Sequence, residues 1–270
     1  MIDKRKIKRS FNTHACTYDQ SAHLQQKVAG EVIECVRSFG VYPARILDIG
    51  TGTGYITLAL KKLFPYAKSQ ACDIAYGMLM VAKAKGEKLF CNQLDFINAD
   101  AEYLPYRGEK FDLVTSSLTY QWLDDWRCAF KEVLRVLQVG GIFFFTTLGD
   151  GTLFELRESY LQSYRELGNT GTPHLHNFIN RSALHSILIE EGFIEVSVES
   201  RFERQYHYAV KDLLINLKTI GAQNASKQYP SGLGKPKVFG RMVDTYEDRY
   251  RGTLGIPATY ELLFGVGRKA

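Results

Sequence analysis

Short apolar runs recur through the first half of the chain, and several of them end at a glycine or an acidic residue. Runs of this length, bounded in this way, are typical of buried strands. The predicted strands are residues 45–49, residues 69–73, a short stretch ending near Asn98, residues 111–117 and residues 142–147. A helix is predicted directly after the first strand, over residues 55–63.

The second half of the chain has a different pattern. Residues 194–202 alternate apolar and polar side chains, which predicts a strand, and residues 259–266 predict another. The stretch between them has helical spacing, with Leu213, Leu214 and Leu217 on one predicted helix and Phe239, Met242, Val243 and Tyr246 on a second. At the front, residues 11–18 precede an amphipathic helix over residues 22–39, and this segment is expected to close the site from that side.

A glycine-rich turn, Leu47 to Gly54, joins the first strand to its helix. Glycines let the backbone turn sharply and let a ligand approach where a Cβ atom would clash, so the turn predicts a nucleotide-type binding loop. A dinucleotide fingerprint would place glycine at position 55, where Tyr55 stands. Asp48 would repel a pyrophosphate and attract a cation. S-adenosylmethionine carries a sulfonium and an ammonium group, so the loop favours this cofactor over NAD.

Downstream residues support the same cofactor. Asp73 follows Gly54 by 19 residues, the interval at which an acid can accept hydrogen bonds from ribose hydroxyls. Ile74 and Met78 could sandwich an adenine ring, and Asp100 could accept from its amino group. Taken singly, each residue also fits a helix cap, a surface turn or the core. The predicted cofactor-binding residues are Asp48, Gly50, Thr51, Gly52, Asp73, Ile74, Met78, Asp100, Ala101 and Ser117.

The order of these strands and loops resembles the class I S-adenosylmethionine-dependent methyltransferases over about the first 150 residues. The resemblance implies an α/β fold with a doubly wound, mostly parallel, seven-stranded Rossmann-like sheet. In that fold the last two strands normally form a tight hairpin, so the long stretch between them is predicted as a helical lid over the cofactor mouth. The predicted organisation is an N-terminal helical cover (1–40), a cofactor-binding core (41–205), the lid (206–256) and a final core strand (257–270).

A closer resemblance extends over nearly the whole chain. Its segments are residues 11–19, Tyr120-Gln121-Trp122, residues 145–148, 151–153 and 155–156, residues 217–222 and residues 259–265. They resemble the malonyl-acyl-carrier-protein O-methyltransferases of biotin synthesis. The resemblance implies methylation of the free carboxylate of a malonyl thioester held on acyl carrier protein. The methyl ester would mask the negative charge, so that fatty-acid enzymes could elongate the chain.

This chemistry places few demands on catalytic side chains. The malonyl carboxyl group is ionised at neutral pH, so neither a general base nor a metal is needed. Alignment of the reacting atoms and exclusion of water would provide the catalysis. The candidates are Tyr18, His14, Gln121, Lys218 and Arg201. Tyr18 and Gln121 are preferred for shaping the site and Arg201 or Lys218 for holding the carboxylate, although each also fits a packing, capping or solvated role.

Composition narrows the setting. The chain is 45% hydrophobic, and no apolar run approaches the ~20 residues that span a membrane. The charged N-terminus lacks the apolar stretch of a secretory signal. The five cysteines are unclustered, which favours buried thiols in a reducing cytoplasm over disulfides or metal ligands.

The net charge of +5 favours an acidic partner. Acyl carrier protein fits this expectation, and the basic residues predicted to steer it are Lys227, Lys235, Lys237 and Arg241, with the run from Lys4 to Arg9 as the other candidate. Nucleic acid is disfavoured, because no nucleic-acid-binding motif is visible and Ser116 to Thr119 lacks the pattern of base-methylating enzymes.

Two other functions stay open. A methyltransferase acting on a phenol or quinone would need a general base, and no histidine is convincingly placed near the end of the fourth strand. A non-catalytic cofactor-binding regulator would be expected to lose parts of the cofactor site, yet Asp48, Gly50, Gly52, Asp73 and Asp100 are all present.

Overall fold

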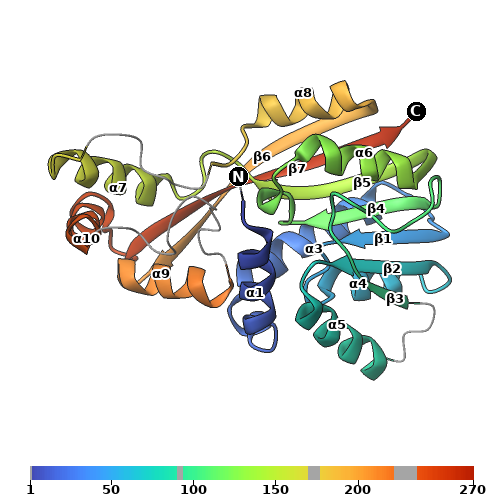
Figure 1. Ribbon diagram of the computed structural model, residues 1–270, viewed down its shortest axis with the longest axis horizontal. Coiled ribbons are helices and arrows are strands. Elements are labelled where there is room, and N and C mark those ends of the chain that lie inside the picture. The colour runs from blue at the N-terminus through green and yellow to red at the C-terminus, as the bar shows by residue number, and fades with distance from the viewer. Residues whose placement is uncertain (1, 90–93, 170–176, 222–235) are drawn as a thin grey trace.

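The computed structural model describes residues 2–89, 94–169, 177–221 and 236–270, and these form one seven-stranded sheet (Figure 1). The strands are β1 (Arg45–Ile49), β2 (Lys68–Asp73), β3 (Leu94–Asn98), β4 (Phe111–Ser117), β5 (Leu137–Leu148), β6 (Phe193–His207) and β7 (Ile256–Lys269). Their order is β3-β2-β1-β4-β5-β7-β6, with β1 to β5 parallel and β7 antiparallel to both of its neighbours. The predicted doubly wound, mostly parallel sheet is confirmed.

Helices cover both faces of this sheet. The α-helices are α1 (Lys4–His14), α2 (Tyr18–Ser21), α3 (His23–Ser38), α4 (Tyr55–Leu63), α5 (Tyr76–Lys88), α6 (Trp126–Val136), α7 (Phe154–Glu166), α8 (Arg181–Glu191), α9 (Val210–Thr219) and α10 (Pro236–Tyr250). Helices α6 and α8 pack around an aromatic core that includes Phe130, Phe143 and Tyr120. Helices α3 and α4 pack on the other face. Apolar side chains on both faces explain why the central strands appear in the sequence as continuous apolar runs.

The last two strands are longer than predicted. Residues 194–202 and 259–266 were expected to be strands, whereas β6 spans Phe193–His207 and β7 spans Ile256–Lys269. Beyond Phe202 the sequence of β6 is polar, with Glu203, Arg204 and Gln205 in succession, so no apolar alternation marks it as a strand. Pairing with β7 continues to His207 nevertheless, because backbone hydrogen bonds do not require apolar side chains.

The extended arms of β6 and β7 carry a helical unit made of α7, α9 and α10, which lies to the left in Figure 1. Both helices predicted between the last two strands are present as α9 and α10. Of their predicted apolar residues, Leu213, Met242 and Tyr246 are buried, whereas Phe239 is exposed. Helix α7 joins them, although its residues were assigned to the core: Tyr250 Oη donates to Glu158 Oε2 of α7 at 2.7 Å. Leu156 and Tyr160 of α7 also pack in the apolar cluster that holds Leu213 and Met242, so the apolar face of α7 belongs to the helical unit.

The N-terminal segment adds a helix that sequence patterns did not indicate. Helix α1 begins at Lys4, because the side chain of Asp3 accepts hydrogen bonds from the backbone N–H groups of Arg5 and Lys6. Asn12 then accepts a hydrogen bond from Gly77 N of α5 at 2.6 Å. This hydrogen bond joins α1 to α5, and Figure 1 shows α1 between α5 and α9.

Candidate active site

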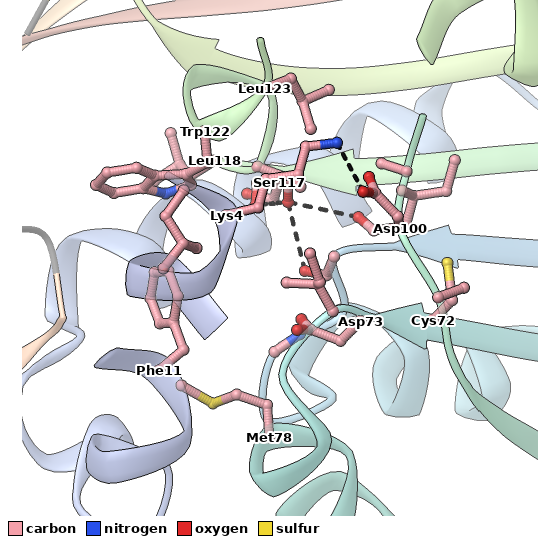
Figure 2. A pocket seen from close by; sticks show the side chains of 18 of the residues that line it. Lys4, Phe11, Cys72, Asp73, Met78, Asp100, Ser117, Leu118, Trp122 and Leu123 are labelled. Carbon is pink, nitrogen blue, oxygen red and sulfur yellow. Dashed lines mark hydrogen bonds and ion pairs between the residues drawn. The ribbon is translucent and has the colours of Figure 1, made fainter. Parts of the chain in front are cut away.

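A pocket lies at the carboxyl ends of the central parallel strands. Chain order reverses between β1 and β4, and ligands of open α/β sheets bind at such a switch point. The residues that line the pocket are Lys4, Ile7, Phe11, Tyr18, Ile49, Gly50, Gly52, Cys72, Asp73, Ile74, Met78, Ala99, Asp100, Ala101, Ser117, Leu118, Thr119, Trp122 and Leu123. Figure 2 shows Phe11 and Trp122 on one side of the pocket and Asp73, Asp100 and Cys72 on the other.

The glycine loop has the backbone that the sequence indicated. Gly50 and Gly52 have φ angles of +67° and +55°, a left-handed conformation that other residues adopt only with strain. A Cβ atom at Gly52 would meet no other protein atom within 4 Å, so this side of the loop is open to a ligand. A Cβ atom at Gly50 would instead stand 2.1 Å from Thr119 Oγ1. One glycine thus leaves room for a ligand and the other for the turn that follows β4.

Asp73 links the loop to the end of β2. Its Oδ2 accepts from Gly52 N at 2.9 Å, and its Oδ1 accepts from Ala75 N at 2.8 Å. Burial raises the pKa of Asp73 to about 6; the charge of Asp48 adds to the rise, and the two backbone hydrogen bonds oppose it. Each carboxylate oxygen keeps further acceptor capacity, so ribose hydroxyls can still donate to it.

Two of the predicted cofactor residues lie beneath the pocket and do not line it. Asp48 is buried and accepts from Thr57 Oγ1 at 2.7 Å and Thr115 Oγ1 at 2.9 Å. Burial raises the pKa of its carboxyl group, with the threonine hydroxyls opposing the rise. Thr51 is within hydrogen-bond distance of Thr57, at 2.8 Å between their Oγ1 atoms. These contacts brace the loop from below, and direct cofactor binding by Asp48 or Thr51 stays a prediction.

The predicted adenine end of the pocket carries a lysine that sequence reasoning did not assign to it. Asp100, Ala101 and Ile74 line the pocket here, and Lys4 reaches Asp100 from α1 (Figure 2). Met78 lines the pocket too, but it packs near Phe11 and Tyr18. The Nζ atom of Lys4 lies 2.6 Å from Asp100 Oδ2 and 2.7 Å from Glu102 Oε2. Burial lowers the pKa of Lys4, but its hydrogen bonds to these two carboxylates outweigh burial and raise it. Lys4 therefore stays charged, and its ion pairs join α1 to the segment after β3 that carries Asp100 and Glu102.

A second set of contacts fastens the other end of the N-terminal segment. Asp19, next to Tyr18, accepts from Thr53 Oγ1 at 2.6 Å and pairs with Lys85 Nζ at 2.5 Å. The glycine loop and α5 therefore both hold this segment in place. The cover predicted from the front of the chain lies against the pocket through α1 and α2.

The side of the pocket formed by Phe11 and Trp122 is aromatic and apolar. Phe11 packs edge-on against both Trp122 and Tyr18, with ring centroids 5.9 and 6.3 Å apart. Leu118 lines the same region, and Ser117 Oγ lies 3.0 Å from Thr146 Oγ1. Burial, with the charges of Asp73 and Asp19, raises the pKa of the Tyr18 hydroxyl. Tyr18 is therefore a neutral hydrogen-bond donor on this side.

The other candidates for substrate binding do not line the pocket. Gln121 is buried, and its Nε2 donates to Leu118 O at 2.6 Å, so it braces the turn after β4. Arg201 lies on β6, where it pairs with Glu31 at 3.2 Å and Glu199 at 2.9 Å. Lys218 is exposed near the end of α9. The roles of these three residues in substrate binding stay predictions.

His14 does not line the pocket either, and its Nδ1 lies 2.8 Å from Ser10 O within α1. No described residue of the insertion between β6 and β7 lines the pocket. Gly221, just after α9, does approach α1, because its carbonyl oxygen accepts from Ser10 Oγ at 3.2 Å. The predicted position of the lid over the cofactor mouth stays a prediction.

Within the described ranges, no group of three or more His, Cys, Asp or Glu side chains is arranged to hold a metal ion. Among the same residues, no helix is both long and apolar enough to cross a membrane.

The strands and loop that carry the pocket match a known family. Residues 47–145 match the family described as a methyltransferase domain. The YcgJ protein of Bacillus subtilis has a similar fold, with a TM-score of 0.62 and 17% identity over 89% of this chain and 98% of that one. A putative methyltransferase of Bacillus halodurans also has a similar fold, with a TM-score of 0.60 and 20% identity over 88% of this chain and 98% of that one. Residues 47–145 thus match a methyltransferase domain, and the two solved structures show that the chain shares its fold with them.

Relatives over the full length narrow the class. The chain is 39% identical to the malonyl-[acyl-carrier protein] O-methyltransferase of Geobacter sulfurreducens, with all of both chains covered. Proteins of the same name from Gallionella capsiferriformans and Brevibacillus brevis are 34% and 32% identical, covering 98% and 97% of this chain and 90% and 95% of theirs. The chain belongs to the malonyl-[acyl-carrier protein] O-methyltransferase family. The resemblance inferred from its motifs is confirmed.

Cofactor binding is expected to weaken below pH 6. Asp73 must be ionised to accept from two ribose hydroxyls, and in the free protein its pKa is about 6. As the pH falls below that value, binding must release a proton, so affinity drops by up to about tenfold per pH unit. Titration with S-adenosylhomocysteine should therefore show about tenfold weaker binding at pH 5 than at pH 8.

The Asp73→Asn variant supplies the control, because it cannot titrate at this position. Its affinity should be weaker throughout and nearly independent of pH between 5 and 8. An equally steep pH dependence in this variant would assign the titration to a group other than Asp73.

Proposed function

We propose that this chain transfers a methyl group from S-adenosylmethionine to the free carboxylate of a malonyl group held as a thioester on acyl carrier protein. The product would be the methyl ester that primes biotin synthesis, in a cytosolic setting. The observation that carries the proposal is membership of the family over the whole chain. The match includes the helical unit and the long β6–β7 hairpin, which lie outside the shared methyltransferase domain.

The two ends of the pocket suit the two reactants. Asp73 and Asp100 offer hydrogen-bond acceptors at one end, where the ribose and adenine of the cofactor would lie. S-adenosylmethionine, when bound, supplies an electrophilic methyl group. Phe11, Trp122 and Leu118 form an apolar wall at the other end, which excludes water from the reacting carboxylate. Placing a carboxylate beside a methyl donor without water is catalysis by proximity and orientation.

Tyr18 is the catalytic candidate that lines the pocket. Because its pKa is raised, its hydroxyl keeps its proton at neutral pH and donates a hydrogen bond instead of acting as a base. We propose that Tyr18 orients the substrate carboxylate and that Gln121 shapes the site through the Leu118 carbonyl. Arg201 and Lys218 are the alternative partners of the substrate carboxylate. For Arg201 to bind it, the ion pairs of Arg201 with Glu31 and Glu199 would first have to break.

A carboxylate nucleophile also fits the ionisable groups of this pocket better than a phenol does. A phenol must lose a proton to a general base. No histidine is among the residues found to line the pocket within the described chain, and the remaining acceptor capacity of Asp73 is assigned to the ribose hydroxyls of the cofactor. A malonyl carboxyl group is already ionised at neutral pH and requires no base.

The proposal is tested by mass spectrometry after incubation with isotopically labelled S-adenosylmethionine. Malonyl-carrier should gain one labelled methyl group, and treating the product with mild alkali should release it as methanol, as expected of an ester. Acetyl-carrier, which lacks the free carboxylate, is the matched control and should gain none.

A chelator in the assay should leave the rate unchanged, because the nucleophile needs no metal to become ionised. Labelling of acetyl-carrier equal to that of malonyl-carrier would contradict methylation at the malonyl carboxylate. No labelling of either thioester by folded, cofactor-binding protein would contradict the proposed function as a whole.

A further inference from the structure

Helix α1 presents two different faces. Lys4, Ile7 and Phe11 line one wall of the pocket, and Figure 2 shows Lys4 and Phe11 pointing into it. Its exposed side carries Arg5, Lys8 and Arg9. The helix carries no acidic residue, so the charge of its exposed side comes from Arg5, Lys8 and Arg9 and is positive.

Among the described residues, no acidic side chain pairs with the basic residues on the exposed side of α1. Lys4 is paired with Asp100 and Glu102, but the side chains of Arg5, Lys8 and Arg9 form no ion pair within the described part of the chain. A surface residue gains little from an isolated ion pair, so unpaired basic residues are not costly in themselves. Three of them on one helix that also walls the pocket nevertheless give this edge of the pocket a positive surface.

The basic residues of the helical unit present a contrast. Helix α10 carries three basic and three acidic residues, so its own charges balance. Arg241 pairs with Glu166 at 2.8 Å and Arg249 with Glu158 at 3.0 Å, and Arg251 also pairs with Glu247. Lys227 and Lys235, which the sequence placed in the same group, lie outside the described residues. Within the described chain, the unpaired charge is therefore denser on α1 than on α10.

We infer that the exposed side of α1 is the surface on which acyl carrier protein docks. This inference rests on the proposed function, because it takes its occupant, an acidic protein bearing the malonyl thioester, from that proposal. Charge complementarity selects the surface: acidic side chains of the carrier would face Arg5, Lys8 and Arg9. Position supports it, because Phe11 of the same helix lines the apolar end of the pocket, where the malonyl carboxylate must arrive. The docking surface and the pocket wall are then different faces of the same helix, so the carrier would bind close to the pocket that receives its malonyl thioester.

The test reverses the charge on this surface without altering the pocket. The double variant Arg5→Glu/Arg9→Glu replaces one like-charge pair at i, i+4 by another, so the stability of the helix should change little. The kcat/KM for malonyl-carrier is expected to fall at least about tenfold, mainly through KM, because steering acts on association. The KM for S-adenosylmethionine and the affinity for S-adenosylhomocysteine should be unchanged, because neither Arg5 nor Arg9 lines the pocket.

Lys237→Glu is a single-reversal control on α10, since Lys237 is an exposed lysine of the basic group first predicted to steer the carrier. It should lower kcat/KM for malonyl-carrier less than twofold. Raising the salt concentration should lower turnover of malonyl-carrier by the unaltered chain more steeply than turnover by the double variant, because exposed charges are screened beyond about 8 Å at physiological ionic strength.

Other outcomes separate the docking surface from the function. If the unaltered chain methylates malonyl-carrier and the double variant does so with the same kcat/KM, the docking surface is wrong and the function stands. A loss as large in Lys237→Glu as in the double variant would also overturn the assignment to α1. If the unaltered chain methylates no thioester, the proposed function itself fails.

Discussion

Replacing Asp73 with alanine should weaken cofactor binding at least tenfold while the protein stays folded. Each hydrogen bond to a charged group contributes roughly 1.5–3 kcal/mol, and the variant would lose the acceptor for two ribose hydroxyls. It would also leave Gly52 N without the carboxylate that now accepts from it at 2.9 Å. The glycine loop would therefore be less well ordered for the ligand. Calorimetric titration with S-adenosylhomocysteine measures the change directly.

Asp95→Ala is the matched control for this variant. Asp95 is an exposed acid on β3, the strand beside β2, and it does not line the pocket. The change in net charge is the same, so a general electrostatic effect would appear in both variants. Unchanged affinity in Asp73→Ala would remove Asp73 from the ribose site.

Alanine substitutions at Gly50 and Gly52 should have different main effects, although the two positions share one loop: the first should lower mainly stability and the second mainly cofactor affinity. At Gly50 the new Cβ would stand 2.1 Å from Thr119 Oγ1 and 2.5 Å from its Cγ2. Overpacking of this kind costs about 1–3 kcal/mol, and the left-handed backbone adds about 1–2 kcal/mol. The free energy of unfolding should fall by about 3 kcal/mol, which lowers Tm by roughly 10 °C in a chain of this size.

Gly52→Ala should lose only about 1–2 kcal/mol of stability, the cost of the left-handed backbone, because the added Cβ meets no protein atom within 4 Å. That open space is the space a ligand would use, so cofactor affinity should fall at least tenfold while Tm falls by only a few degrees. Thermal unfolding and calorimetry on both variants separate the two effects. Equal losses of stability at both positions would show that Gly52 does not face an open ligand site.

Local patterns predicted the centre of the fold well. The glycine loop, the acid that ends β2 and the apolar positions of β1 and β4 are each determined by residues close together in sequence. The strand–turn–helix order then limits the topology to few choices, because parallel strands need crossovers of one hand. The residues of the predicted cofactor site that line the pocket are Gly50, Gly52, Asp73, Ile74, Met78, Asp100, Ala101 and Ser117.

Contacts between distant segments were beyond such patterns. Lys4 meets Asp100 across 96 positions, and nothing in a run of basic residues distinguishes a paired lysine from a solvated one. The partners of Arg201 lie on α3 and on its own strand, so its ion pairs became visible only once β6 was placed beside α3. Thr115 lies 67 residues from Asp48, so the hydrogen bond that it donates to this acid could not be inferred from local sequence either. Each case depends on side-chain direction, which a single sequence does not specify.

The β6–β7 hairpin has a consequence for how this protein could be divided or recombined. Its helical unit is assembled from separate parts of the chain: α7 follows β5, α9 and α10 lie between the hairpin strands, and Tyr246 Oη donates to Pro257 O at 2.6 Å at the start of β7. Removing residues 206–256 would leave the apolar face of α7 uncovered and two long strand arms without their helices. The helical unit is therefore not a detachable module. A graft that aims to change its specificity must carry α7 and both strand arms together.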